Sequence, residues 1–316
     1  MPLPSDERIL TLANDILGQF GKIFGEHPGF RPAHAKGTMF TGIFTPSANA
    51  SSLTRAPHVT RPSTRVTARF SNSTGIPLLA DNDPNANPRG LAVRFHLAER
   101  VHTDIVSHST DGFPTRTGAE FVEFLRAVAS SDPAHLSGSA LEAFLGSHPA
   151  ALAFVQTPKP APVSFATETY FGVTAMRFSN AASASRFGRF RILPEAASAH
   201  LDDVAARAKG PNDLFEEIAG RVSKGPVRFK VVVQVARNDD VVDDATVHWP
   251  EDRKLVELGR LELTAPVPNS PGEEKQIIFD PIPRVDGIEP SADPLLELRA
   301  AVYLISGRRR RAAAGA

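Results

Sequence analysis

Cysteine is absent from this sequence of 316 residues. Its absence excludes disulfide bonds, thiolate ligation of a metal, iron–sulfur clusters and cysteine nucleophiles. Long apolar runs are missing too, since no stretch approaches the roughly 18 residues that a membrane-spanning helix needs. The first 25 residues do not resemble a secretory signal, because Asp6, Glu7 and Asp15 interrupt any apolar segment. We therefore expect a cytoplasmic protein with no membrane span.

An excess of one charge is also lacking. Lys and Arg together number 35, and so do Asp and Glu, which makes the formal net charge zero. A general nucleic-acid binder is usually more basic, so we expect no nucleic-acid partner. The acidic run at residues 239–244 is interpreted as an exposed turn, with a cation site as the less favoured alternative.

Tyrosine is scarce, whereas phenylalanine is abundant. The chain has two tyrosines, Tyr170 and Tyr303, against 20 phenylalanines. A Phe-rich interior suits a dry apolar pocket, but it is equally typical of an ordinary core. Apolar residues make up 41% of the chain, which is enough for one large core. We expect a single domain over residues 1–316, with an N-terminal helical arm (1–30) and a basic tail (305–316).

Strand-like patterns recur through most of the chain. Many of these stretches alternate apolar with polar residues, as half-buried strands do. They cover residues 37–44, 65–71, 91–97, 169–178, 187–193, 227–236 and 255–263. Their irregular spacing argues against a propeller or a solenoid and favours an antiparallel barrel.

Helical patterns interrupt these strands. Apolar residues recur at helical spacing over residues 6–24. Thr117 and Glu120 form a capping box ahead of an apolar run, and Ser139 with Glu142 repeats the pattern. We expect a helix after each of these signals.

The C-terminal half holds further helical signals. Two helices separated at Gly210–Pro211 are expected within residues 199–222. The last helix is expected to begin near Ser291, which is a good N-cap residue. Residues 74–90 and 265–290, rich in Pro and Gly, are interpreted as excursions over the surface.

Two residues of the last helix form a chemically distinctive pair. Arg299 and Tyr303 are four residues apart, so they share one face of the helix. A guanidinium beside a phenol favours the phenolate, which is a hard anionic ligand suited to ferric iron. Taken alone, this spacing more often belongs to a buried tyrosine that hydrogen-bonds to a surface arginine.

The residues around this pair change that interpretation. The segment resembles the proximal region of catalases, which show the pattern G-I-E-P-S-x-D-x-x-L-x-x-R-x-x-x-Y. The matching residues are Gly287, Ile288, Glu289, Pro290, Ser291, Asp293, Leu296, Arg299 and Tyr303. This resemblance implies that Tyr303 is the metal ligand on the haem iron and that Arg299 partners its phenolate.

The N-terminal half resembles the distal side of the same family. The segment RPAHAKG, which begins at Arg31, is similar to R-x-x-H-A-[RK]-G and implies that His34 is the distal histidine. The segment VTARFS, similar to V-x-x-R-F-S, implies that Ser71 hydrogen-bonds to His34 and fixes its tautomer. Arg31 and Arg69 are expected to pair with the haem propionates, because arginine suits carboxylates. The ordinary alternative for each arginine is an exposed charge.

Three more cofactor contacts follow from the resemblance. Residues 104–121 are similar to the family segment D-x-x-x-N-x-x-x-x-F-F-x-R and the phenylalanine after it. This implies that Phe113 lines the distal pocket and that Phe121 lies against the haem, although such residues usually belong to a core. Arg310, which follows Tyr303 by seven positions, matches a further arginine that binds a propionate.

The sequence departs from the catalase pattern in two places. The distal asparagine of the family is replaced by His108. We predict that His108 is catalytic, as a second base that is bulkier than asparagine and can change its charge near neutral pH. Typical catalases also continue well beyond the proximal tyrosine, whereas this chain ends 13 residues after Tyr303. The chain therefore resembles the short catalase-related peroxidases.

The resemblance implies an α+β protein, an antiparallel β-barrel of about eight strands with helical additions and a buried haem b. It also implies a peroxidase that reduces hydrogen peroxide and organic hydroperoxides with a small organic reductant. Weak catalase activity, the preferred peroxide and a homo-oligomeric state stay open, and no role for NADPH is expected. The alternatives are an enzyme that rearranges fatty-acid hydroperoxides and a non-catalytic haem- or lipid-binding barrel. Retention of His34, Ser71 and Tyr303 argues against a carrier.

Overall fold

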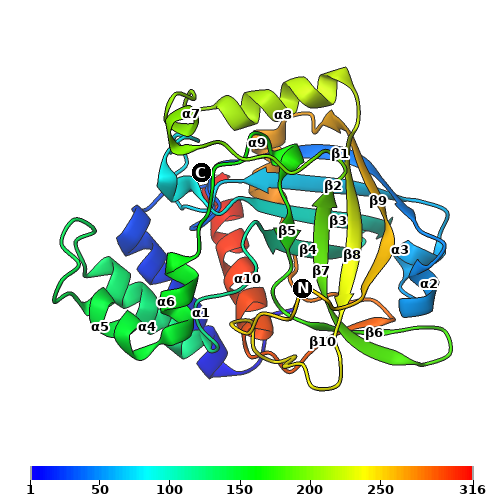
Figure 1. Ribbon diagram of the computed structural model, residues 1–316, viewed down its shortest axis with the longest axis horizontal. Helices are drawn as coiled ribbons and strands as arrows, with labels where there is room; N and C mark the ends of the chain where they lie inside the picture. Colours follow the sequence, from blue (N-terminus) through cyan, green and yellow to red (C-terminus); the bar gives the residue numbers. More distant parts are fainter. Residues whose placement is uncertain (1, 315–316) are drawn as a thin grey trace.

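The computed structural model describes residues 2–314 and contains a closed antiparallel barrel of eight strands (Figure 1). The strands are β1 (Gly37–Pro46), β2 (Thr64–Ser71), β3 (Gly90–Ala98), β4 (Val101–His108), β5 (Tyr170–Phe171), β7 (Ser185–Pro194), β8 (Val227–Val235) and β9 (Leu255–Pro266). Neighbours along the ring are β1–β2–β3–β4–β5–β7–β8–β9, and the β9–β1 pairing closes it. The predicted fold class is therefore confirmed, whereas the single-domain interpretation of residues 1–316 stays a prediction.

Two short strands extend the barrel at one end. Strand β6 (Met176–Ser179) pairs with β7 and with β10 (Ile288–Pro290). The single strand expected over residues 169–178 is wrong, because the chain leaves the ladder between β5 and β6. Phe171 pairs with Arg191 and Met176 with Gly188, so four residues of one strand would have to oppose two of the other.

Helices cover one side of the barrel and its upper end in Figure 1. The longer ones are α1 (Glu7–Phe24), α4 (Gly118–Ala129), α5 (Ala140–Ser147), α6 (Pro149–Gln156), α8 (Asp213–Lys224) and α10 (Leu295–Ala314). The short ones are α2 (Ala50–Leu53), α3 (Pro57–Thr60), α7 (Asp203–Arg207), α9 (Ser270–Gln276) and the 3-10 turns Pro84–Ala86 and Phe165–Thr167. The capping box of α4 and the break between α7 and α8 agree with the sequence prediction.

Helix α10 has two apolar faces and lies between the barrel and the helices α1 and α4 (Figure 1). Leu296 and Ala300 pack into the barrel core, whereas Leu298 and Ala301 pack against α1 and α4. A helix that is apolar on two faces is buried between two layers. This arrangement places the middle of α10 directly beside the barrel wall.

The start of α10 differs from the prediction. The helix begins at Leu295, and the carboxylate of Asp293 accepts a hydrogen bond of 2.9 Å from the Leu295 amide. Ser291 is not the N-cap, because its hydroxyl accepts only from Asp293, one turn before the helix. Residues from 305 onward, predicted as a basic tail, continue α10 to Ala314.

The barrel interior holds many of the large aromatic residues. Phe40, Phe44, Phe70, Phe95 and other phenylalanines are fully buried there and pack edge to face or stacked. For most phenylalanines the ordinary interpretation as core residues is therefore correct.

One buried residue of helix α3, packed against the barrel, makes stability depend on pH. His58 is buried between Phe44 and Phe95, and its Nδ1 has no hydrogen-bond partner among the described residues. Burial lowers the pKa of His58 to about 4, whereas an unfolded chain keeps a pKa of about 6.5. Because the unfolded state binds the proton first, stability is lost as the pH falls from 6.5 to 4.

We expect His58 to reduce the free energy of unfolding by about 2 kcal/mol between pH 7 and pH 5. Urea unfolding at the two pH values measures this loss. In His58→Leu the loss between pH 7 and pH 5 should shrink by that amount, since leucine suits the apolar site and binds no proton. An equal loss in both proteins would show that His58 does not cause it.

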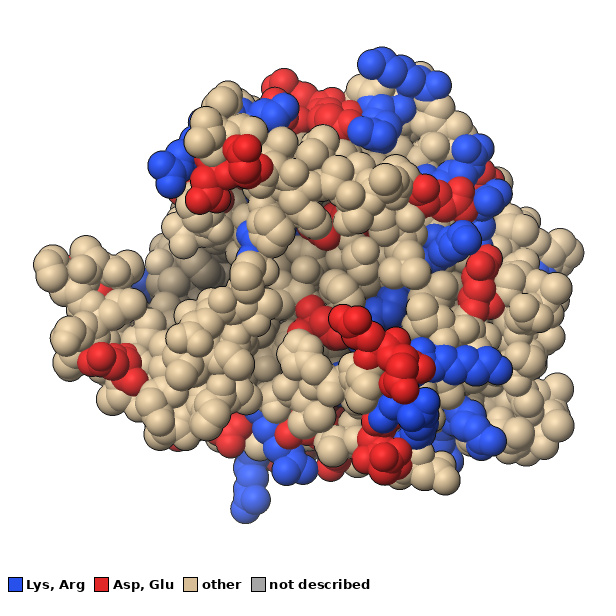
Figure 2. Space-filling view, viewed as in Figure 1, with Lys and Arg blue, Asp and Glu red and all other residues tan. Residues whose placement is uncertain are grey.

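The surface carries charges of both signs. Figure 2 shows basic and acidic side chains interspersed on one face of the molecule. In the acidic run, Asp240 pairs with Arg253 while Asp243 and Asp244 pair with Arg116. Residues 2–314 contain no group of three or more carboxylates or histidines suited to a metal ion. None of the helices in this range has the length and apolar character that a bilayer crossing requires.

Candidate active site

A cavity of about 330 Å³ lies between the barrel wall and helix α10. Its lining is mainly apolar and includes all ten site residues predicted from the sequence. These are Arg31, His34, Arg69, Ser71, His108, Phe113, Phe121, Arg299, Tyr303 and Arg310. The fold therefore brings together residues from two ends of the chain that are separated by more than 270 positions.

Strand register builds the barrel side of this cavity. Gly90 of β3 pairs with Ser71 of β2 on one side and with His108 of β4 on the other. A Cβ atom on Gly90 would lie 2.5 Å from the Ser71 hydroxyl and 2.8 Å from Nδ1 of His34. Glycine at position 90 is therefore required for His34 to lie against the end of the barrel. Gly90 was not among the predicted site residues, because it lies at the end of the stretch 74–90, which was interpreted as a surface excursion.

His34 is held in an unusual backbone conformation. Its φ of 57° lies in the left-handed region, and its amide donates to the Ser73 carbonyl at 3.0 Å. Nδ1 of His34 lies 3.0 Å from the Ser71 hydroxyl, which is the hydrogen bond that the resemblance implied. Such strained positions cluster at functional sites because the surrounding structure must hold them.

His34 is a neutral imidazole. Burial lowers its pKa to about 4, and the charges of Arg69 and Arg31 act in the same direction. A neutral imidazole can accept a proton at one nitrogen while the other is engaged in a hydrogen bond. The contact with Ser71 engages Nδ1. In the tautomer in which Nδ1–H donates to the Ser71 hydroxyl, Nε2 is the nitrogen that can serve as a base.

The second predicted base, His108, carries its hydrogen on Nε2, so this nitrogen donates a hydrogen bond and does not accept a proton. The Thr110 amide donates to Nδ1 of His108 at 3.3 Å, so Nδ1 is an acceptor and the hydrogen sits on Nε2. Burial lowers the pKa of His108 to about 3. The expectation that His108 changes charge near neutral pH is therefore wrong, because burial keeps the ring neutral. Its Nε2–H is a neutral donor, as the amide group of asparagine would be.

Helix α10 supplies the other polar pair of the cavity. A guanidinium nitrogen of Arg299 lies 3.4 Å from the Tyr303 hydroxyl, and the guanidinium carbon is 5.8 Å from the ring centroid. Tyr170, the only other tyrosine, is fully buried in the barrel and donates to the Phe165 carbonyl. Tyr303 is therefore the tyrosine that the structure places in the cavity.

Phe113 and Phe121, the two phenylalanines predicted for the site, both line the cavity. The rings of Phe113 and Phe121 lie 4.9 Å apart, and Phe121 also packs edge to face on Phe20 of α1. These ring contacts make the cavity wall around Phe113 and Phe121 apolar. Both positions agree with the pocket-lining places expected for them, although their contacts with a cofactor remain predictions.

Three arginines converge at one end of the cavity. Arg31 and Arg310 both donate to the carbonyl of Ile277, at 3.2 and 2.7 Å. Arg69 and Arg31 donate to the carboxylate of Glu274 on α9. The side chains of Arg31 and Arg69 are 14% and 3% exposed, so the alternative interpretation of these two as exposed charges is wrong. Arg310 is 4% exposed.

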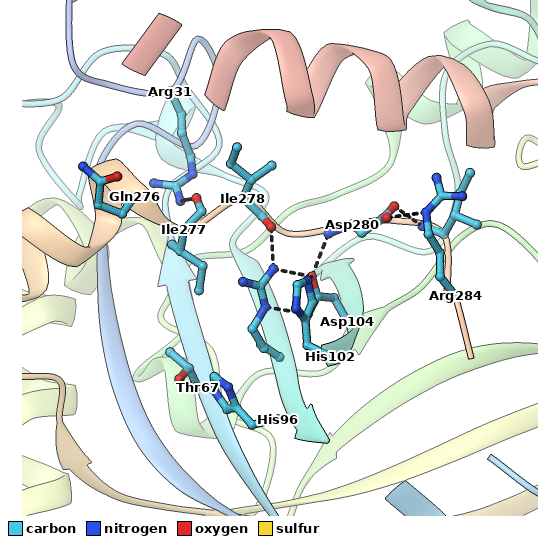
Figure 3. Close-up of polar contacts among 12 residues, drawn as sticks. Arg31, Thr67, His96, His102, Asp104, Gln276, Ile277, Ile278, Asp280 and Arg284 are labelled. Atoms are coloured by element: carbon cyan, nitrogen blue, oxygen red, sulfur yellow. Dashed lines mark hydrogen bonds and ion pairs between the residues drawn. The ribbon is translucent and has the colours of Figure 1, made fainter. Parts of the chain in front are cut away.

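The segment that carries Ile277 is tied to the barrel (Figure 3). The carboxylate of Asp104 accepts a hydrogen bond of 2.7 Å from the Asp280 amide and pairs with Arg94. Arg94 also donates to the Ile278 carbonyl. These contacts hold the backbone of residues 277–280 along the edge of the cavity. The residues of this segment, predicted as a surface excursion, therefore help to build the site.

The fold and the cavity define a class of protein, an antiparallel barrel enzyme whose site joins a histidine–serine pair to an arginine–tyrosine pair. A family model described as catalase matches residues 25–314. The chain belongs to the catalase family.

The relatives and solved structures that resemble this chain carry names from the same family. A catalase-related peroxidase of Mycolicibacterium paratuberculosis is 35% identical over 289 residues, which cover 90% of each chain. A catalase-related peroxidase of Synechococcus elongatus is 31% identical over 306 residues, covering 94% of this chain and 88% of that one. A fungal catalase crystal structure matches with a TM-score of 0.79 at 22% identity, over 90% of this chain and 60% of that chain. The chain is thus an oxidoreductase of the peroxidase and catalase kind.

Membership of this family implies a haem cofactor, and the cavity residues fit one. The lining is largely apolar, as a porphyrin ring requires, while three guanidiniums at one end suit carboxylate groups. Nε of Arg310 is buried without a hydrogen-bond partner among the described residues, so a donor is left for another group. Tyr303 supplies a phenolic oxygen of the kind that binds ferric haem in catalase.

Proposed function

We propose that the protein is a haem b peroxidase that reduces hydrogen peroxide and organic hydroperoxides with a small organic reductant. The observation that carries this proposal is the presence of a neutral His34, bonded to Ser71, in the same cavity as the Arg299–Tyr303 pair. A carrier would have no use for a base held in a strained conformation.

In this proposal Tyr303 would bind the iron as a phenolate, and Arg299 would stabilise its negative charge. Arg31, Arg69 and Arg310, which line the cavity, would hold the propionates, and Phe121 would lie against the ring. When bound, the haem supplies the redox chemistry of peroxide reduction. Phe113 lines the pocket in which the peroxide binds.

The chain itself supplies proton transfer. In the proposed tautomer the Nδ1 hydrogen of His34 is donated to the Ser71 hydroxyl, which lies 3.0 Å away, so that Nε2 is free to take a proton from one peroxide oxygen. The same nitrogen returns that proton to the other oxygen as the O–O bond breaks, so His34 ends as it began. Nε2–H of His108 donates to the peroxide and helps to orient it.

Steady-state assays with hydrogen peroxide test this proposal. We expect the haem-loaded protein to oxidise a phenolic dye efficiently and to release oxygen slowly. Rapid oxygen release with little dye oxidation would show that the protein acts mainly as a catalase and would contradict the proposed peroxidase activity. Rearrangement of a fatty-acid hydroperoxide without any need for the dye would favour the rearranging enzyme instead.

The same assay tests the part played by His108. Asparagine keeps a neutral donor but occupies less space than imidazole. We therefore expect His108→Asn to retain haem and dye oxidation while its ratio of oxygen release to dye oxidation rises several-fold, because a second peroxide has more room. The matched control is His96→Asn, since His96 bonds to Thr67 outside the cavity. An unchanged ratio in His108→Asn would contradict this role.

A further inference from the structure

Helix α9 places a carboxylate among the arginines that are proposed to hold the propionates. One oxygen of Glu274, Oε2, accepts hydrogen bonds from Nε and Nη2 of Arg69 at 2.9 and 2.7 Å. The same oxygen accepts from Nη1 of Arg31 at 3.3 Å. The Glu274 side chain is only 12% exposed, so these ion pairs are largely shielded from water. The sequence alone does not distinguish Glu274 as a site residue, because it lies between another glutamate and a lysine in a short polar stretch.

The surrounding structure preserves these contacts. A Cβ atom on Gly37 of β1 would lie 2.1 Å from Nη2 of Arg69, so glycine leaves the room that this guanidinium occupies. Arg31 is further fixed by its second contact, with the Ile277 carbonyl. The position of Glu274 is therefore a defined part of the site and not a chance contact at the surface.

Positive charge is in excess at the end of the cavity where the three arginines converge. Three guanidiniums lie there, and in the part of the chain from residue 2 to 314 Glu274 is the carboxylate with which Arg31 and Arg69 form ion pairs. Burial lowers the pKa of Arg31 well below its usual value, with Arg69 and Arg310 acting in the same direction and Glu274 opposing them. A buried cation without a counter-ion is strongly destabilising. Glu274 therefore stabilises this cluster of arginines when no other anion pairs with them.

The same contacts put Glu274 in competition with the cofactor. Arginine binds a carboxylate best through two parallel donors, and Glu274 engages Nε and Nη2 of Arg69. A haem propionate seeks the same kind of donor, so each contact kept by Glu274 is unavailable to it. We propose that Glu274 is an internal counter-ion, which stabilises the protein without haem and competes with the haem carboxylates for Arg69 and Arg31. The competition rests on the proposed haem site, whereas the stabilising effect does not.

Glu274→Gln separates these two effects, and Glu273→Gln is the matched control. Glu273 lies on the same helix and is exposed, so its substitution changes the net charge equally without touching the arginines. Without haem, we expect the melting temperature of Glu274→Gln to fall about 4 °C below that of Glu273→Gln, the shift expected from losing one ion pair. An equal melting temperature would overturn the role as counter-ion. This measurement needs no haem.

The competition is tested with two porphyrin probes. Each protein is loaded with ferric protoporphyrin IX or with its dimethyl ester, and loss of the probe to excess apomyoglobin is timed. We expect Glu274→Gln to lose ferric protoporphyrin IX about tenfold more slowly than Glu273→Gln, since one charged competitor is removed. The dimethyl ester has no carboxylates, so the two variants should lose it at the same rate.

Faster loss of ferric protoporphyrin IX from Glu274→Gln would overturn the competition, and so would an equal effect on both probes. If Glu274→Gln does not fold, Glu274→Asp replaces it, because the shorter acid cannot reach both arginines. Slower loss is then expected relative to wild type, and faster or unchanged loss contradicts the proposal. If wild type binds neither porphyrin, the proposed function fails, while the melting temperatures still decide the role as counter-ion.

Discussion

Replacing Tyr303 with phenylalanine should remove most of the haem from the purified protein. The substitution deletes the phenolic oxygen and leaves Arg299 without the partner that it has at 3.4 Å. Because the cavity residues proposed to bind haem contain no thiolate and no second tyrosine, we expect haem content to fall at least about tenfold. Absorbance of the ferric protein at equal protein concentration measures the loss.

Tyr170→Phe is the matched control for this result. The Tyr170 hydroxyl donates to the Phe165 carbonyl inside the barrel, away from the cavity. Its removal should cost about 1 kcal/mol of stability, the usual value for one buried hydrogen bond. Haem content and spectrum should not change. If Tyr303→Phe keeps the wild-type spectrum, Tyr303 is not the ligand.

Replacing His34 should slow the reaction with peroxide while the haem stays bound. Asparagine is the better replacement than alanine, because residue 34 has a φ of 57° and asparagine tolerates the left-handed region. The amide group cannot accept and return a proton as imidazole does. We expect His34→Asn to react with hydrogen peroxide about 10²–10⁴-fold more slowly, which is the usual contribution of an acid–base group.

Rapid mixing of the haem-loaded protein with hydrogen peroxide, followed by haem absorbance, measures this rate. Ser71→Ala serves as the companion variant, since it removes only the contact that orients His34 at 3.0 Å. Its rate should fall much less than that of His34→Asn. A near-wild-type rate in His34→Asn would show that another group moves the proton.

Local spacing and periodicity allowed much of this architecture to be predicted. The i, i+4 spacing of Arg299 and Tyr303 places them on one helix face, and the structure brings them into contact. The capping box of Thr117 and Glu120 is present in α4. These features depend on residues a few positions apart, so sequence alone defines them.

Features that depend on register or on distant contacts were not predictable in this way. The pairing of Gly90 with both Ser71 and His108 arises from three strands, and the tautomer of His108 from a backbone amide of Thr110. Strand β4 was missed because His102, Thr103 and Asp104 break its apolar pattern. Asp104 is buried because it pairs with Arg94 and caps the Asp280 amide.

Helix boundaries show the same limit. Ser291 and Asp293 are both good N-cap residues, and only the folded chain decides between them. Helix α9 has seven residues and carries a glycine and a proline, so it lacks the length from which helical periodicity is recognised. Glu274 was therefore not among the site residues predicted from the sequence, although it contacts two of the predicted arginines.

Tyrosinate ligation of the haem iron is the central claim, and a resonance Raman spectrum of the ferric protein tests it most directly. We predict vibrations of an iron-bound phenolate in wild type and in Tyr170→Phe, and their absence from whatever haem Tyr303→Phe retains. A wild-type spectrum typical of histidine ligation, without phenolate vibrations, would contradict the account.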